Sequence, residues 1–106
     1  MNPMTHRRIN YRRIAEAARA NSGAIMAQWL PRGRREGHEW CSLNPRRDDR
    51  RPGSFRINLR TGAWGDFALP DARGGDLISL GAYLFNLSQH EAALAVARML
   101  GIDPNE

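Results

Sequence analysis

Lysine is missing from this chain, cysteine occurs once, and there are no long apolar runs. All sixteen basic residues are arginine, and the single cysteine, Cys41, rules out an internal disulfide. No apolar run approaches the roughly 20 residues that a membrane span needs. Residues 1–9 are basic, and no apolar stretch follows them, so we expect no signal peptide. These absences predict a cytoplasmic protein without a membrane segment.

The length and composition predict one small domain. The chain has 106 residues, of which 42% are hydrophobic, so it can bury a core of limited size. Residues 1–9 show no apolar periodicity and are expected to form a flexible basic tail. Residues 10–106 are expected to form the domain itself.

The charge is distributed unevenly along the chain. Residues 1–31 carry five arginines against one acid, a net charge of +4, and residues 32–60 carry nine arginines against four acids, a net charge of +5. Residues 61–106 carry two arginines against six acids, a net charge of −4. GC-rich codon usage would explain the choice of arginine over lysine. The uneven distribution of charge indicates a basic surface that could bind a polyanion and an acidic C-terminal end.

Four helices are predicted from apolar spacing and capping signals. The first covers residues 11–20, and the second covers residues 22–30, before Pro31. A basic loop is expected over residues 32–37. The third and fourth helices are expected at residues 76–86 and 88–100. Ser88 with Glu91 three residues later gives a capping box at the start of the fourth.

The middle of the chain predicts three short antiparallel strands. Residues 54–59 alternate apolar and polar side chains, as a strand with one buried face does. Residues 60–62 provide a turn with a glycine, and residues 63–68 return. Residues 38–43 are expected to form the remaining strand. Helices at both ends and a small antiparallel sheet between them make an α+β fold.

The motifs of residues 40–81 follow one another in a recognisable order. They are Asn44-Pro45, Pro52-Gly53-Ser54-Phe55, Trp64-Gly65-Asp66-Phe67 and Gly74-Gly75-Asp76. This order resembles the zinc-binding domain, a zinc ribbon, of bacterial and phage DNA primases and primase-helicases. The resemblance covers residues 32–101 and implies a zinc-ribbon-like sheet flanked here by added helices.

The resemblance also implies where four zinc ligands would lie, and this chain lacks them. The first pair falls at Asn44 and Arg47, and the second falls near Ala68 and Asp71. Arginine has no lone pair to give to zinc, and neither asparagine nor alanine makes a structural zinc site. We therefore expect a degenerate, metal-free ribbon with no cofactor. Aromatic packing is the expected replacement for the metal, from Trp29, Trp40, Trp64, Phe55 and Phe67.

The resemblance implies that the sheet and its entry loop face single-stranded DNA. Guanidinium groups neutralise phosphates, and exposed aromatic rings stack on bases. The candidate nucleic-acid-binding residues are Arg34, Arg35, Arg46, Arg47, Arg50, Arg51, Arg56, Arg60 and Trp64. Trp64 is the expected stacking platform, because it lies opposite Arg56 on the partner strand.

Each candidate has a structural alternative. The loop arginines could pair with Asp48 and Asp49 in a solvated cluster, and Trp64 could belong to the core. Asp66 could pair with Arg56 across the hairpin. No candidate catalytic group has a partner at a recognisable spacing: this holds for His38, His90, Cys41 and Ser54. The chain is therefore not expected to be an enzyme.

The predicted function is a non-catalytic module that binds single-stranded template DNA in a primase-like replication protein of a phage, plasmid or other mobile element. One alternative is an interaction module whose acidic C-terminal helices dock a helicase or primase partner. Another is a stand-alone regulator of replication or DNA transfer.

Overall fold

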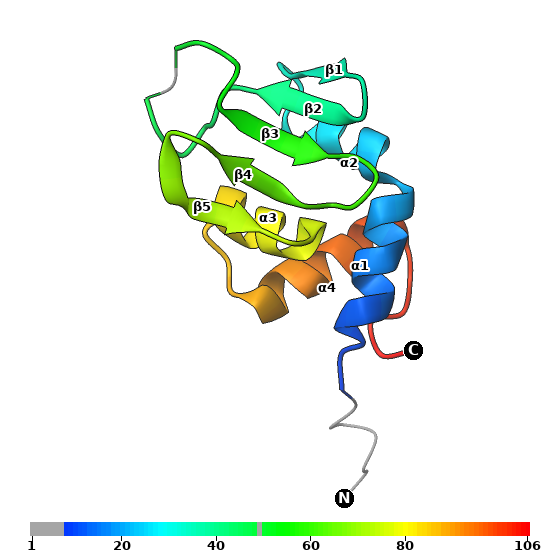
Figure 1. Ribbon diagram of the computed structural model, residues 1–106. Helices are drawn as coiled ribbons and strands as arrows, with labels where there is room; N and C mark the ends of the chain where they lie inside the picture. The colour runs from blue at the N-terminus through cyan, green and yellow to red at the C-terminus, as the bar shows by residue number, and fades with distance from the viewer. Residues whose placement is uncertain (1–7, 49) are drawn as a thin grey trace, which may run out of the picture.

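A computed structural model describes residues 8–48 and 50–106 (Figure 1). The predicted tail of residues 1–9 lies mostly outside the described residues, and so does Asp49. The helices are α1 (Tyr11–Ala20), α2 (Ser22–Trp29), α3 (Leu77–Phe85) and α4 (Gln89–Leu100). The strands are β1 (Arg34–Glu36), β2 (Glu39–Ser42), β3 (Phe55–Asn58), β4 (Trp64–Asp66) and β5 (Leu69–Gly74). The fold is α+β, as predicted.

The sheet has five antiparallel strands in sequence order, so the prediction of three strands is wrong. The two missed strands, β1 and β5, are the edges of the sheet. Residues 34–36 (Arg-Arg-Glu) carry no apolar signal, and the basic loop expected there is a strand paired with β2. Residues 69–74 contain Pro70 and expose most of their side chains, so no alternation marks them. Edge strands need little burial, and proline is tolerated there.

The helices cover one face of the sheet (Figure 1). Helix α3 packs against β5, α4 and α1, while α2 lies behind β2 and β3. The hydroxyl of Ser22 at the start of α2 donates to the carbonyl of Leu59 at 2.7 Å. The indole Nε1 of Trp40 donates to the carbonyl of Leu30 at 3.1 Å. These bonds attach the added N-terminal helices to the ribbon.

Local sequence explains where the helices begin and end. Asp76 caps α3 by accepting a hydrogen bond from the Ser79 amide, and Asn86 ends the helix in the left-handed region. The predicted capping box of Ser88 and Glu91 is present at the start of α4. The pKa of Glu91 is lowered, first by its hydrogen bond from the Ser88 backbone. No helix among the described residues is long and apolar enough to cross a membrane.

Aromatic side chains form two clusters in the protein. In the core, Phe55, Trp64 and Tyr83 lie with ring centroids 5.0–6.4 Å apart. Trp29 and Phe85 make a separate edge contact at 5.6 Å. Phe67 was expected among the packing aromatics, but it is 83% exposed, so this part of the prediction is wrong. Phe67 lies in the turn that follows β4, one residue past Asp66.

Candidate nucleic-acid interface

A buried polar network joins the loop after β2 to the turn between β4 and β5. The amide Nδ2 of Asn44 donates to Asp66 Oδ2 at 2.8 Å and to the Tyr83 hydroxyl at 2.9 Å. Arg47 Nε donates to the same Asp66 oxygen at 2.7 Å, and Arg47 Nη2 donates to Ser54 Oγ at 2.6 Å. The Asp66 side chain is fully buried, and the Arg47 side chain is 23% exposed. We call Asn44, Arg47, Ser54, Asp66 and Tyr83 the Asp66 network.

The hydrogen bonds in this network keep Asp66 ionised. Burial alone would raise the pKa of Asp66, because it disfavours the charged carboxylate. The donors Arg47, Asn44 and the Ala68 amide outweigh burial and lower the pKa from 3.8 to about 2. A carboxylate with several donors in a low-dielectric site is bound tightly by them.

The donor set does not fit a zinc ion. The atoms that converge at this place are N–H groups of Asn44 and Arg47, and they are directed at one carboxylate. Among residues 8–48 and 50–106, no group of three or more His, Cys, Asp or Glu side chains could hold a metal. The second ligand pair was expected near Ala68 and Asp71. It is Asp66 that meets Asn44 and Arg47, while Ala68 contributes only its backbone amide, which donates to Asp66 Oδ1 at 2.9 Å.

Three of the four predicted loop arginines are on the surface. Arg50 and Arg51 are exposed, and Arg50 lies 3.5 Å from Asp48 in a solvated pair. Arg46 is also exposed, although its Nη1 donates to the Tyr83 carbonyl at 2.7 Å and its guanidinium lies 5.4 Å from the centroid of that ring. Arg47 belongs to the Asp66 network. The alternative of a solvated cluster is seen for Asp48, which pairs with Arg50, while Asp49 lies outside the described residues.

Arg56 on β3 is paired with acids of the neighbouring strands. Its Nη1 lies 3.0 Å from Glu39 and 3.4 Å from Glu36, and its Nε donates to the Gly53 carbonyl at 2.9 Å. The pKa of Arg56 is raised, first by the hydrogen bond to Glu39. The expected pair between Arg56 and Asp66 is absent from the ion pairs of the described residues, because the two side chains leave the sheet on opposite faces.

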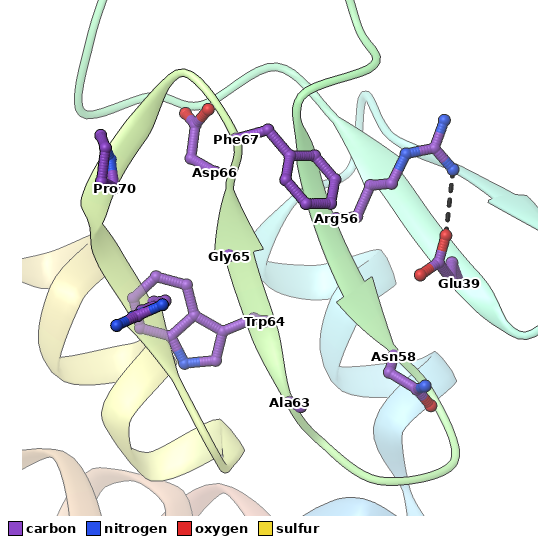
Figure 2. Close-up of a pocket in the computed structure, with 10 residues that line it drawn as sticks. Glu39, Arg56, Asn58, Ala63, Trp64, Gly65, Asp66, Phe67 and Pro70 are labelled. Carbon is purple, nitrogen blue, oxygen red and sulfur yellow. Dashed lines mark hydrogen bonds and ion pairs between the residues drawn. The ribbon is translucent and has the colours of Figure 1, made fainter.

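A shallow pocket lies on the outer face of the sheet, away from the helices (Figure 2). Its volume is about 510 Å³. Arg56 on β3 pairs with Gly65 on β4, and Gly65 pairs with Arg73 on β5, so the three form a row across the sheet. The complete lining consists of Glu39, Arg56, Asn58, Ala63, Trp64, Gly65, Asp66, Phe67, Pro70 and Arg73. We call this the outer pocket.

Trp64 is a core residue, as its structural alternative stated, and is not an exposed stacking platform. Trp64 is 6% exposed, and its indole Nε1 donates to the Ser79 hydroxyl at 2.9 Å. Alternation along β4 turns Trp64 and Asp66 inward and Gly65 outward, and Phe67 is exposed in the turn that follows. The exposed aromatic on this face is therefore Phe67. Its position one residue after Asp66 could have indicated the same strand face as Gly65.

The remaining predicted arginines lie at the margins. Arg60 is exposed at the turn between β3 and β4, at the opposite end of the outer pocket from Phe67. Arg34 and Arg35 are exposed on edge strand β1, and Arg34 pairs with Glu36 at 3.1 Å. Arg73 was missed by the sequence analysis, because β5 was not predicted. It is exposed and has no ion pair within residues 8–48 and 50–106.

The arrangement of sheet and helices is similar to that of part of a solved bacterial primase structure. No protein-family model and no curated protein sequence matches the chain.

The fold of this chain is similar to part of a solved structure of the Aquifex aeolicus primase, which contains the zinc-binding and RNA polymerase domains of that protein. The TM-score is 0.66 at 24% identity, over 85% of this chain and 22% of that one. This likeness shows the fold. The present chain spans about a fifth of the length of that primase chain.

Proposed function

We propose that this protein is a non-catalytic module that binds single-stranded template DNA for a primase-like replication protein of a phage, plasmid or other mobile element, acting in the cytoplasm without zinc. The observation that carries this proposal is the position of exposed arginines around a primase-like sheet. Arg46, Arg50 and Arg51 lie in the loop that the Asp66 network fastens to the edge of the outer pocket.

The local bonding supports this surface as a DNA site. Phe67 N donates to the Ser54 carbonyl at 2.9 Å, so the arginine loop and the exposed ring meet at one end of the sheet. Arg50 and Arg51 keep their charges at the surface, where they can displace counterions from phosphates. Arg47 supports the loop from inside and is not required to touch DNA.

Salt dependence of binding tests the proposal. Fluorescence anisotropy with a labelled 12-nucleotide oligo(dT) should give log Kd linear in log salt, with a slope that reports the neutralised phosphates at about 0.7 per contact. Changing Arg46, Arg50 and Arg51 to alanine should reduce the magnitude of that slope by up to about 2. Arg47 is left intact, because its loss would disturb the fold.

A matched control removes the same charge elsewhere. Arg8, Arg12 and Arg98 are exposed and lie on the helical side of the molecule. Changing these three to alanine should leave the slope close to that of the unchanged protein. Equal losses in both triple variants would mean that net charge alone attracts DNA. No measurable binding of oligo(dT) by the unchanged protein at low salt would reject the proposed function.

One surface favours a second candidate, a docking module for a helicase or primase partner. Phe85 at the end of α3 is 50% exposed and packs its edge against Trp29. An exposed aromatic beside an acidic C-terminal region suits a basic, apolar partner surface. Loss of partner binding in a Phe85→Ala variant with intact DNA binding would support this candidate. A stand-alone regulator of replication or transfer would use the same DNA surface.

A further inference from the structure

Phe67 lies at the rim of the outer pocket, and hydrogen bonds from two consecutive backbone amides hold this part of the chain in place. Its own amide donates to the Ser54 carbonyl, and the next amide, of Ala68, donates to the buried Asp66 carboxylate. A single exposed apolar side chain is common and carries no weight by itself. Here the exposed ring borders a pocket, and its anchoring leaves little conformational entropy to lose when a ligand binds.

The floor of the outer pocket is open because Gly65 has no side chain. Arg56 and Arg73 flank it in register, and Figure 2 shows the Phe67 ring projecting over β3 on the Arg56 side of the pocket. A methyl group built on Gly65 would meet Arg73 Cβ at 3.5 Å and the Ala72 carbonyl at 3.8 Å, which are ordinary contacts. The fold therefore has room for a methyl group at Gly65, and the glycine leaves that space open.

The charges of the pocket decide which part of a nucleic acid it suits. Arg56, Arg73 and Glu39 line the pocket, whereas the carboxylate of Asp66 is buried on the other face of the sheet and paired with Arg47. Arg56 is already paired with Glu39 at 3.0 Å. A phosphate beside Arg56 would therefore have to compete with Glu39 for that guanidinium. A flat, neutral aromatic group can stack on Phe67, and its neighbouring phosphates can reach the exposed Arg73 and the loop arginines.

We propose that the outer pocket holds one unstacked nucleobase of single-stranded DNA, stacked on Phe67 above Gly65. This inference rests on the proposed function and assigns the base-binding position within it. It also replaces Trp64 with Phe67 as the stacking residue. Arg73 becomes the positive group that lies nearest to the DNA backbone at this position.

A comparison of two probes separates base contacts from phosphate contacts. One is a labelled 12-nucleotide oligo(dT), and the other has the same length and charge with abasic sites throughout. Stacking of a base on an aromatic side chain is worth about 1–3 kcal/mol, which is roughly 5- to 150-fold in Kd. Phe67→Ala should weaken oligo(dT) binding within that range and leave binding of the abasic probe unchanged. Phe67→Trp should restore oligo(dT) binding.

A second variant fills the pocket without touching Phe67. Gly65→Val adds a β-branched side chain to a strand, so folding should be preserved or improved. Oligo(dT) binding should fall at least as far as in Phe67→Ala, because the added side chain occupies the base position. Phe85→Ala removes the other exposed phenylalanine, on α3, and should bind both probes like the unchanged protein.

The outcomes distinguish the two proposals. If Phe67→Ala and Gly65→Val bind oligo(dT) like the unchanged protein, with the salt slope intact, the pocket assignment is wrong and the DNA-binding function stands. Equal weakening of both probes by Phe67→Ala would also overturn the assignment, because the loss would not involve a base. If the unchanged protein binds neither probe, the proposed DNA-binding function is wrong, and the pocket assignment that rests on it is wrong as well.

Discussion

Replacing Asp66 with asparagine should destabilise the protein far more than a surface charge change would. The substitution keeps the size of the side chain but removes the negative charge of the carboxylate to which Arg47 and Asn44 donate hydrogen bonds. It also introduces an NH₂ group among N–H donors, so that one of them loses its acceptor. The guanidinium of Arg47 loses its two bonds to the Asp66 carboxylate.

The structure sets the size of this effect. The pKa of Asp66 falls from 3.8 to about 2, and one pKa unit corresponds to about 1.4 kcal/mol, so the folded state favours the carboxylate by about 2–3 kcal/mol. Removing one partner of a buried ion pair costs about 3–5 kcal/mol. We expect a loss of about 3 kcal/mol, which lowers the melting temperature by roughly 10–20 °C in a domain of this size.

Thermal and urea unfolding followed by circular dichroism should measure this loss, and pH gives it a signature. Because the folded pKa is depressed, the stabilisation is fully present above about pH 4 and disappears as the pH falls through about 2. The stability difference between the unchanged protein and Asp66→Asn should shrink over this interval. Adding Arg47→Met to the Asp66→Asn variant should cost less than the sum of the two single changes, because both remove the same ion pair.

Two results would refute this reasoning. One is an Asp66→Asn variant that melts within a few degrees of the unchanged protein at pH 7. The other is a stability difference that stays constant from pH 5 to pH 2. Either would mean that the Asp66 network forms in the folded state without contributing to its stability.

Two further predictions concern the metal and the core. Excess chelator should leave the melting temperature unchanged, and metal analysis of the purified protein should find zinc well below one equivalent; a chelator-induced drop would contradict the metal-free proposal. Gly74→Ala should cost about 1–3 kcal/mol, because the added Cβ lies 2.6 Å from Trp64 Nε1 and crowds its hydrogen bond to Ser79. Urea unfolding followed by tryptophan fluorescence measures this loss, and an unchanged midpoint would show that Trp64 can move.

The elements whose structure depends on residues close in sequence were predicted correctly from local sequence patterns. The helices followed from apolar spacing and caps, and the β3–β4 hairpin followed from its alternation and glycine turn. Edge strands β1 and β5 were missed, because neither buries a continuous apolar face. The loop after β2 was recognised as arginine-rich, but the sequence did not indicate that Arg47 points inward and binds Asp66.

The site was harder to predict, because its contacts join distant residues. Asp66 and Arg47 are 19 positions apart, and nothing in either neighbourhood marks them as partners. Trp64 was correctly placed on a strand, but the sequence left open whether it packs in the core or faces DNA, and the structure places it in the core. An arginine on an unpredicted strand, Arg73, could not be considered at all.

The Asp66 network should make this fold less sensitive to oxidation than a zinc ribbon held together by thiolates. A thiolate site in a zinc ribbon loses its metal when its cysteines are oxidised, and the fold can be lost with it. A guanidinium, an amide and a carboxylate undergo no such oxidation. The connection between loop and hairpin should therefore survive peroxide at concentrations that release zinc from thiolates, and the only thiol among the described residues, Cys41, is buried. We expect the metal-free scaffold that we propose to stay folded through oxidative stress without a supply of metal.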